Sequence, residues 1–232
     1  MDKRLTYAVL TGDITGSSRV HGPQRQSLLA YMKSLFADAK GYWPRAIARQ
    51  FQIYRGDSFQ GVLGDPRLAL RMAIFLRAGL QAGFRIDHET VFCDARIAMG
   101  VGSIEFLPDL SAEADGEAFR KSGRLLDRMS GDAMLAIETP FKDIDDEVST
   151  ELSLLDTIIE KWSSAQSETV RYALAGLNQT QMAQKLNVSV AAVGQRLKGA
   201  GLRSVETLLA RFETLVDARI TPVTAKAVRT KT

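Results

Sequence analysis

Hydrophobic and polar positions over the first 140 residues predict strands and helices in alternation. Residues 5–11 form an apolar run that predicts a buried strand, which ends where Gly12 and Asp13 follow. Apolar side chains then recur at helical spacing over 23–41, and two β-rich runs around residues 56–57 predict a hairpin. Two more helices are expected, over 66–80 and 118–129, and two more strands, over 95–101 and 133–137.

This order of elements predicts an α+β fold in which helices pack on one face of a mostly antiparallel sheet. The acidic run at 142–147 has no apolar periodicity and indicates a domain boundary, after which a further helix leads to Trp162. The predicted organisation is a sheet domain over 1–146, a linker helix over 147–163, a small all-α domain over 164–218 and a flexible basic tail over 219–232.

The composition is that of a globular protein, with 45% hydrophobic and 25% charged residues among 232. No apolar run approaches the length of a membrane span, and the first residues lack the apolar segment of a signal peptide. Cys93 is the single cysteine and there are two histidines, so neither a disulfide nor a structural zinc site is expected. These features predict a cytoplasmic protein without membrane contact.

Charge is distributed unevenly along the chain. Residues 1–163 carry 20 basic and 23 acidic side chains, whereas residues 164–232 carry 10 basic and 4 acidic ones. A basic C-terminal third suits a nucleic-acid partner, and it equally suits a solvated face, so charge alone leaves both interpretations open.

The sharpest local signal lies in residues 179–193. Two short helices that cross closely need a small residue at the contact, a turn residue that tolerates a left-handed conformation and a β-branched residue that faces back. Ala183, Asn187 and Val193 occupy these positions at the required separations, and Ser189 is a good N-cap for the second helix. The segment resembles the helix-turn-helix of bacterial transcription regulators.

In that arrangement the second helix runs over 190–198 and presents one face to a DNA major groove. Gln195 and Arg196 are the expected base readers, and Lys198 is an expected phosphate contact. A helical hairpin that only packs or dimerises is the alternative. The candidate DNA-binding residues are Ser189, Ala191, Ala192, Gln195, Arg196 and Lys198.

Two carboxylates in the N-terminal part are candidate metal ligands. Asp13 stands at a strand end and Asp57 at a hairpin tip, and each alone suits a turn or cap. If their strands are neighbours, the two side chains converge and repel unless a divalent cation lies between them. The turn around Asp13 has backbone N–H groups suited to phosphate, with candidates Gly12, Thr15, Gly16, Ser17 and Ser18.

Four segments of this part resemble the sequence blocks of class III nucleotidyl cyclases, in the same order. They are GDITGSS at 12–18, GDSF at 56–59, ARIAMGVG at 95–102 and GEAFRKSGRLL at 116–126. Together with a C-terminal helix-turn-helix, the whole chain resembles the SatD family of bacterial proteins. The resemblance implies a ferredoxin-like, nucleotidyl cyclase-like sheet in a homodimer.

The resemblance also implies roles for individual residues. Mg²⁺ or Mn²⁺ would be held by Asp13, Asp57 and the backbone carbonyl of Ile14. Arg124 would stabilise charge on phosphates bound to the partner subunit, and would be the catalytic residue of an active enzyme. Arg120 and Arg124 are therefore candidate phosphate ligands, although four basic residues within nine positions also suit a solvated helix face.

Three further positions bear on the comparison with the cyclase sequence pattern. Arg120 stands where the family has asparagine, Ile53 stands at the position of the base-selecting lysine, and Glu113 aligns with the acidic partner of that lysine. Because the apolar side chain of Ile53 cannot hydrogen-bond a purine, the sequence favours a regulator over an enzyme.

Three functions remain open on the sequence alone. The favoured one is a dimeric DNA-binding transcriptional regulator whose cyclase-like domain senses a nucleotide, cyclic nucleotide or cyclic dinucleotide without catalysis. Its helix-turn-helix would bind a two-fold symmetric DNA operator. The alternative is an active, metal-dependent class III nucleotidyl cyclase with an appended helix-turn-helix. The third is a cyclase-like fold that only dimerises.

Overall fold

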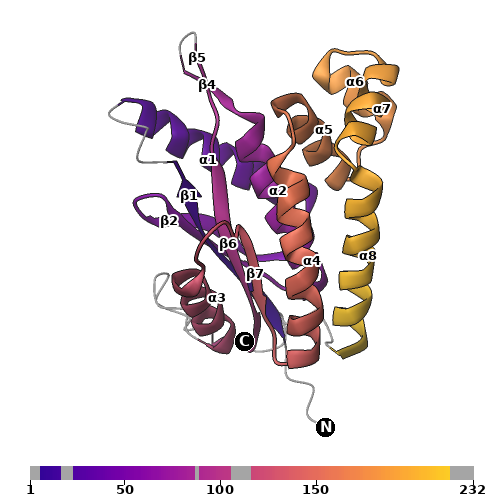
Figure 1. The fold of residues 1–232 in the computed structure, drawn as a ribbon. Coiled ribbons are helices and arrows are strands. Elements are labelled where there is room, and N and C mark those ends of the chain that lie inside the picture. Colours follow the sequence, from indigo (N-terminus) through magenta and orange to yellow (C-terminus); the bar gives the residue numbers. More distant parts are fainter. Residues whose placement is uncertain (1–5, 17–22, 87–88, 106–115, 220–232) are drawn as a thin grey trace.

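The computed structural model describes residues 6–16, 23–86, 89–105 and 116–219. In these residues a five-stranded sheet has the order β2-β3-β1-β6-β7, and β4 and β5 form a separate hairpin (Figure 1). The strands are β1 (Tyr7–Thr15), β2 (Ile47–Arg55), β3 (Ser58–Leu63), β4 (Phe84–Ile86), β5 (Glu89–Val91), β6 (Asp94–Gly102) and β7 (Leu135–Glu138). The helices are α1 (Pro23–Tyr42), α2 (Ala69–Ala82), α3 (Glu117–Arg128), α4 (Lys142–Glu160), α5 (Ser164–Leu174), α6 (Gln179–Leu186), α7 (Val190–Gly199) and α8 (Leu202–Arg219), and a 3₁₀ turn (Pro66–Leu68) precedes α2.

Apart from the inserted β4–β5 hairpin, the elements from β1 to β6 follow the ferredoxin-like β-α-β-β-α-β order. Each of the pairs β2–β3, β3–β1 and β1–β6 is antiparallel, and β7 then adds to β6 in parallel. The prediction of an α+β fold with an antiparallel-dominated sheet is therefore confirmed. The short β4–β5 hairpin was not predicted, because its strands have three residues each.

Helices cover both faces of the sheet, so the prediction of helices on one face is wrong. Ala8 and Leu10 of β1 belong to the main core, which α1, α2 and α4 share. Tyr7 and Val9 point to the opposite face, where they pack with Ala118 of α3. The physical reason lies in β1, which has apolar residues at both odd and even positions. Both of its faces must therefore be buried by other elements.

The C-terminal helices pack on the sheet domain through the same main core. That core continues into Val170 of α5 and Leu209 of α8 without a gap in its buried residues. Helix α5 packs on α2, and α8 lies beside α4 and the 3₁₀ turn (Figure 1). An ion pair of 2.8 Å between Arg71 of α2 and Glu213 of α8 adds a polar link. The division into a sheet domain, linker and helical domain stays a prediction.

Helix α4 begins earlier than the sequence suggested. The acidic run at 142–147, which predicted a boundary, forms its first turns, where Asp143 and Asp145 suit the positive end of the helix dipole. Ile144 and Val148 are buried from the start of the helix, four residues apart. In the sequence the acidic residues around them make this apolar spacing hard to recognise. Within the described part of the chain, no helix is long and apolar enough to cross a membrane.

Candidate functional site

The two predicted carboxylates lie on neighbouring strands at one end of the sheet. Asp13 of β1 pairs in register with Ser58 of β3 on one side and with Arg96 of β6 on the other. Asp57 occupies the β2–β3 turn directly before Ser58. The topology thus brings together the two strand ends that the GDITGSS and GDSF segments predicted.

Asp13 is already engaged by an arginine of the adjacent strand. Arg96 donates from Nε to Oδ1 of Asp13 at 3.0 Å, and its Nη2 contacts Oδ2 in the same fork. Its Nη1 donates to the backbone oxygen of Met129, just beyond α3, at 3.3 Å. The hydrogen bond to Asp13 raises the pKa of Arg96. Sequence reasoning missed this pair, although both residues lie in the segments that carry the cyclase resemblance.

Gly12 has a packing role that explains its presence. It pairs with Phe59 and Ile97 within the sheet, and a Cβ at Gly12 would lie 2.5 Å from the Phe59 ring and 2.7 Å from the Arg96 carbonyl oxygen. A side chain is therefore excluded whether or not phosphate binds here.

The rest of the predicted phosphate turn follows β1. Ile14 is buried and Thr15 ends the strand. Gly16 has a φ of 77°, which glycine adopts without strain. Ser17 and Ser18 lie outside the described residues, so a phosphate cradle in this turn stays a prediction.

Three arginines line the outer side of α3 at four-residue spacing, and we call them the α3 arginine ridge: Arg120, Arg124 and Arg128. Arg124 is exposed, and its Nε donates to the backbone oxygen of Arg120 at 3.2 Å. Arg128 contacts Glu138 of β7 at 2.8 Å. The inner side of α3 is buried on the sheet, so one chain by itself presents Arg124 outward.

Ile53 and Glu113 are the two positions of the predicted base contact. Ile53 packs against the main core from β2, as an apolar side chain should. Glu113 lies outside the described residues.

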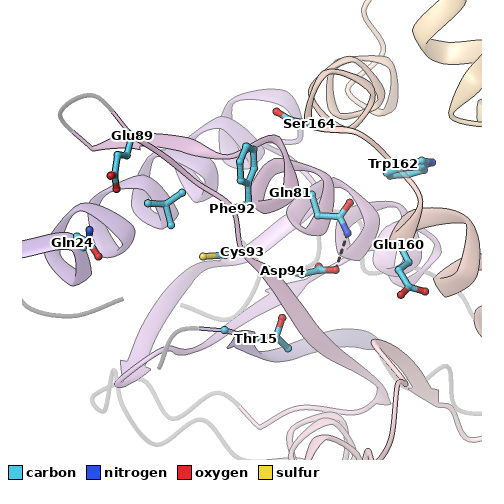
Figure 2. A pocket seen from close by; sticks show the side chains of 12 residues that line it. Thr15, Gln24, Gln81, Glu89, Phe92, Cys93, Asp94, Glu160, Trp162 and Ser164 are labelled. Carbon is cyan, nitrogen blue, oxygen red and sulfur yellow. Dashed lines mark hydrogen bonds between the residues drawn. The ribbon is translucent and has the colours of Figure 1, made fainter. Parts of the chain in front are cut away.

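Two cavities of about 950 and 890 Å³ lie where the sheet meets the helical region, and both are lined by Thr15, Gln81, Asp94 and Glu160. Figure 2 shows the larger one, with the hydrogen bond from Gln81 to Asp94 in its wall. Its described lining holds the carboxylates of Glu89, Asp94 and Glu160 and no lysine or arginine. Such a lining repels phosphate, so this cavity is a poor candidate for a nucleotide.

A buried ion network closes the second cavity. Arg77 of α2 is 1% exposed and binds both carboxylate oxygens of Asp94, at 2.9 and 2.8 Å, as well as Asp156 of α4. Asp156 also accepts backbone N–H bonds from Met134 and Leu135 at 2.9 and 3.1 Å. Burial raises the pKa of Asp156, and the Arg77 charge opposes this rise. The sequence signal was Arg77 itself, which stands within the run 72–80, whose other residues are apolar or glycine.

The segment predicted as a helix-turn-helix forms two helices joined by a tight turn. Asn187 ends α6 in the left-handed conformation, with a φ of 52°. Ser189 then caps α7, with its Oγ accepting from the backbone N–H of Ala192 at 3.1 Å. Ala183 and Val193 are buried between the helices. All four residues thus adopt the local conformations that the spacing predicted.

One side of α7 faces solvent. Ala191, Gln195 and Lys198 are exposed at helical spacing, and Ala192 and Arg196 are partly exposed beside them. The side chains of Gln195 and Lys198 make no hydrogen bond to any residue that the structure describes. The hydroxyl of Ser189, by contrast, accepts the hydrogen bond that caps α7.

These features define an α+β protein of ferredoxin-like topology with a helical region packed beside the sheet. The chain belongs to the SatD family, whose family model matches residues 7–207 and so spans the sheet and most of the helical region. No curated protein matches the sequence.

Solved structures of nucleotidyl cyclases are similar to the chain at low identity. The guanylyl cyclase domain of the RhoGC fusion protein from the aquatic fungus Blastocladiella emersonii is 19% identical over 55% of this chain and 76% of that chain, with a TM-score of 0.44. The adenylate/guanylate cyclase/hydrolase from Silicibacter pomeroyi is 21% identical over 64% and 82%, with a TM-score of 0.42. The guanylate cyclase domain of RhGC from Catenaria anguillulae, in complex with GTP, is 15% identical over 56% and 76%, with a TM-score of 0.39.

Proposed function

We propose that this protein is a dimeric DNA-binding transcriptional regulator whose sheet domain senses a nucleotide, cyclic nucleotide or cyclic dinucleotide without catalysis. The observation that carries the proposal is the outward face of α7. There Gln195 and Lys198 extend into solvent from a helix that is fixed by its cap and by the buried Val193. A rigid helix with free polar side chains is what major-groove readout requires.

In this proposal α6 and α7 form a helix-turn-helix and α7 is the recognition helix. Gln195 and Arg196 read base edges, and Lys198 contacts a phosphate. The excess of 10 basic over 4 acidic side chains in residues 164–232 supports attraction to DNA. The dimer of sheet domains presents two copies of α7 to a two-fold symmetric operator.

The sensing half of the proposal assigns the ligand to the α3 side of the sheet. The α3 arginine ridge is positive and exposed there, whereas the larger cavity is lined by carboxylates and, among the described residues, by no lysine or arginine. An anionic ligand is favoured only where the local potential is positive. Arg124 points away from its own chain and in a dimer would reach phosphates held by the partner.

The DNA-binding half is tested by selecting duplexes from a random pool with the full chain and measuring affinity at two salt concentrations. Lys198→Ala should weaken binding to all sequences and reduce the salt slope by about 1. Arg196→Ala should cost about 1–3 kcal/mol and relax the preference at one base pair. Lys142→Ala, which removes one exposed charge on α4, is the matched control and should change neither.

Two results would refute this half. One is a pool from which no sequence is enriched. The other is an Arg196→Ala variant that keeps both affinity and base preference, because the recognition helix would then lie elsewhere.

The alternative, an active cyclase, is tested by mass spectrometry after incubation with ATP or GTP and Mn²⁺, with Asp57→Ala as control. We expect no cyclic product, since Ile53 packs in the core and offers a purine no hydrogen bond. A product that disappears in the control would make the protein an enzyme. Calorimetry with cyclic nucleotides and cyclic dinucleotides, on wild type and Arg124→Ala, then tests sensing directly.

A further inference from the structure

The cyclase resemblance implies a divalent metal at Asp13 and Asp57, and the residues present do not fit one. Among the described residues no group of three or more His, Cys, Asp or Glu could hold a metal ion. Both carboxylate oxygens of Asp13 are occupied by Arg96. Mg²⁺ needs near-octahedral oxygen coordination and gives up its water reluctantly, so it competes poorly for a carboxylate that is already neutralised.

We infer that the Arg96 guanidinium takes the place of a metal ion at Asp13, so that this site binds no divalent cation. The planar guanidinium matches a carboxylate with two parallel N–H bonds, a geometry that a metal ion would have to break. Its charge also repels any cation that approaches Asp13. The positive charge that a metal would supply at this end of the sheet is thus built into β6.

The fold holds the pair in place from three directions. The β1–β6 register sets residue 13 opposite residue 96. Ala95 and Ile97, on either side of Arg96, are fully buried and fix the backbone of the strand. The Met129 carbonyl accepts from the remaining guanidinium nitrogen and stops the side chain from swinging away. Release of Asp13 would therefore cost more than the breaking of a single surface ion pair.

The inference is tested by measuring Mn²⁺ binding to the full chain with electron paramagnetic resonance of the free ion. Wild type should show no saturable binding that Asp13→Asn removes. Arg96→Gln should bind Mn²⁺ at least about fivefold more tightly than wild type, the scale expected from the loss of a partly exposed ion pair. Arg96→Gln with Asp13→Asn should lose that gain.

Arg128→Gln is the matched control, because it removes an arginine from α3 that pairs with Glu138 and not with Asp13. It should leave Mn²⁺ binding unchanged. The inference is overturned by saturable Mn²⁺ binding to wild type that Asp13→Asn abolishes, or by a folded Arg96→Gln variant without a gain. If Arg96→Gln does not fold, the comparison of Mn²⁺ binding between wild type and Asp13→Asn decides the question alone. The metal readout needs neither DNA nor nucleotide, so its failure is separate from failure of the proposed regulator.

Discussion

The end of the sheet around Asp13 and the outer face of α7 carry the residues on which function was predicted, and they differ in how much of their bonding capacity is already used. At the sheet end, Asp13 is forked by Arg96 and Gly12 is packed under Phe59. On α7, Gln195 and Lys198 bond to nothing in the described chain.

This difference shows that a residue in a sequence motif can serve either the fold or a binding partner. A residue whose bonds are satisfied inside the protein specifies the fold first, and any ligand must compete with that partner. A polar residue that is held rigidly and left exposed adds little to stability by itself, so its side chain is available to a partner. Substitutions at the sheet end should therefore act on stability, and those of Gln195 and Lys198 on the outer face of α7 should act on binding alone.

The largest effect should come from the buried ion network of Arg77, Asp94 and Asp156, which joins α2, β6 and α4. Arg77→Ala leaves the carboxylates of Asp94 and Asp156 without their buried partner and should lower the free energy of unfolding by about 3–5 kcal/mol. Urea denaturation measures the change. Arg71→Ala, on the same helix, breaks only a partly exposed pair with Glu213 and should cost about 1 kcal/mol or less. Equal losses for the two variants would mean that burial of the network adds nothing to its contribution to stability.

A second test separates α3 from the sheet. A Cβ at Gly100 would overlap the backbone oxygen of Ala118 and lie 2.5 Å from the backbone nitrogen of Ser122, so Gly100→Ala should cost about 1–3 kcal/mol. Gly123→Ala lies on α3 with nothing within 4 Å of the new Cβ, and should stabilise by up to about 1 kcal/mol. Thermal unfolding should show shifts of opposite sign. A stable Gly100→Ala variant would refute the close packing of α3 on β6.

On α7 we expect neighbouring residues to differ in their effect on stability for the same reason. Ser189→Ala removes the cap of the helix and should cost about 1 kcal/mol. Gln195→Ala and Lys198→Ala should leave stability within about 0.5 kcal/mol, since neither side chain bonds within the described chain. Thermal unfolding of the three variants checks this. A large loss for Lys198→Ala would show that the outer face of α7 serves the fold and would weaken the DNA-binding proposal.

Sequence reasoning found the elements whose signals are local. The helices expected over 23–41 and 190–198 match α1 and α7 to within one residue, because Pro23 and Ser189 mark their starts and apolar spacing marks their length. The left-handed turn at Asn187 was likewise predictable, since asparagine tolerates that conformation.

The partners of charged residues were not predictable in the same way. Asp13 and Arg96 are 83 residues apart, and Arg77 and Asp156 are 79 apart, so their meeting depends on strand register and helix docking. That helices pack on both faces of the sheet could have been predicted, because β1 has apolar residues at both odd and even positions. The sequence thus indicated which residues gather at the sheet end, and the structure adds which of them bind each other.

The smallest effect expected concerns Glu151 of α4, the helix that packs on both β7 and α8. Its Oε2 is buried with no hydrogen-bond partner among the described residues, and burial, aided by the charge of Glu147, raises its pKa. An acid whose pKa is raised on folding contributes stability below its ordinary pKa of 4.5, and that contribution is lost as pH rises through the raised value. Glu151→Gln cannot ionise, so its thermal stability relative to wild type should increase between pH 4 and pH 7. After solvent screening the gain at neutral pH should stay below about 1 kcal/mol. A difference that is constant with pH, or that falls, would mean that Arg211 offsets the burial of this carboxylate.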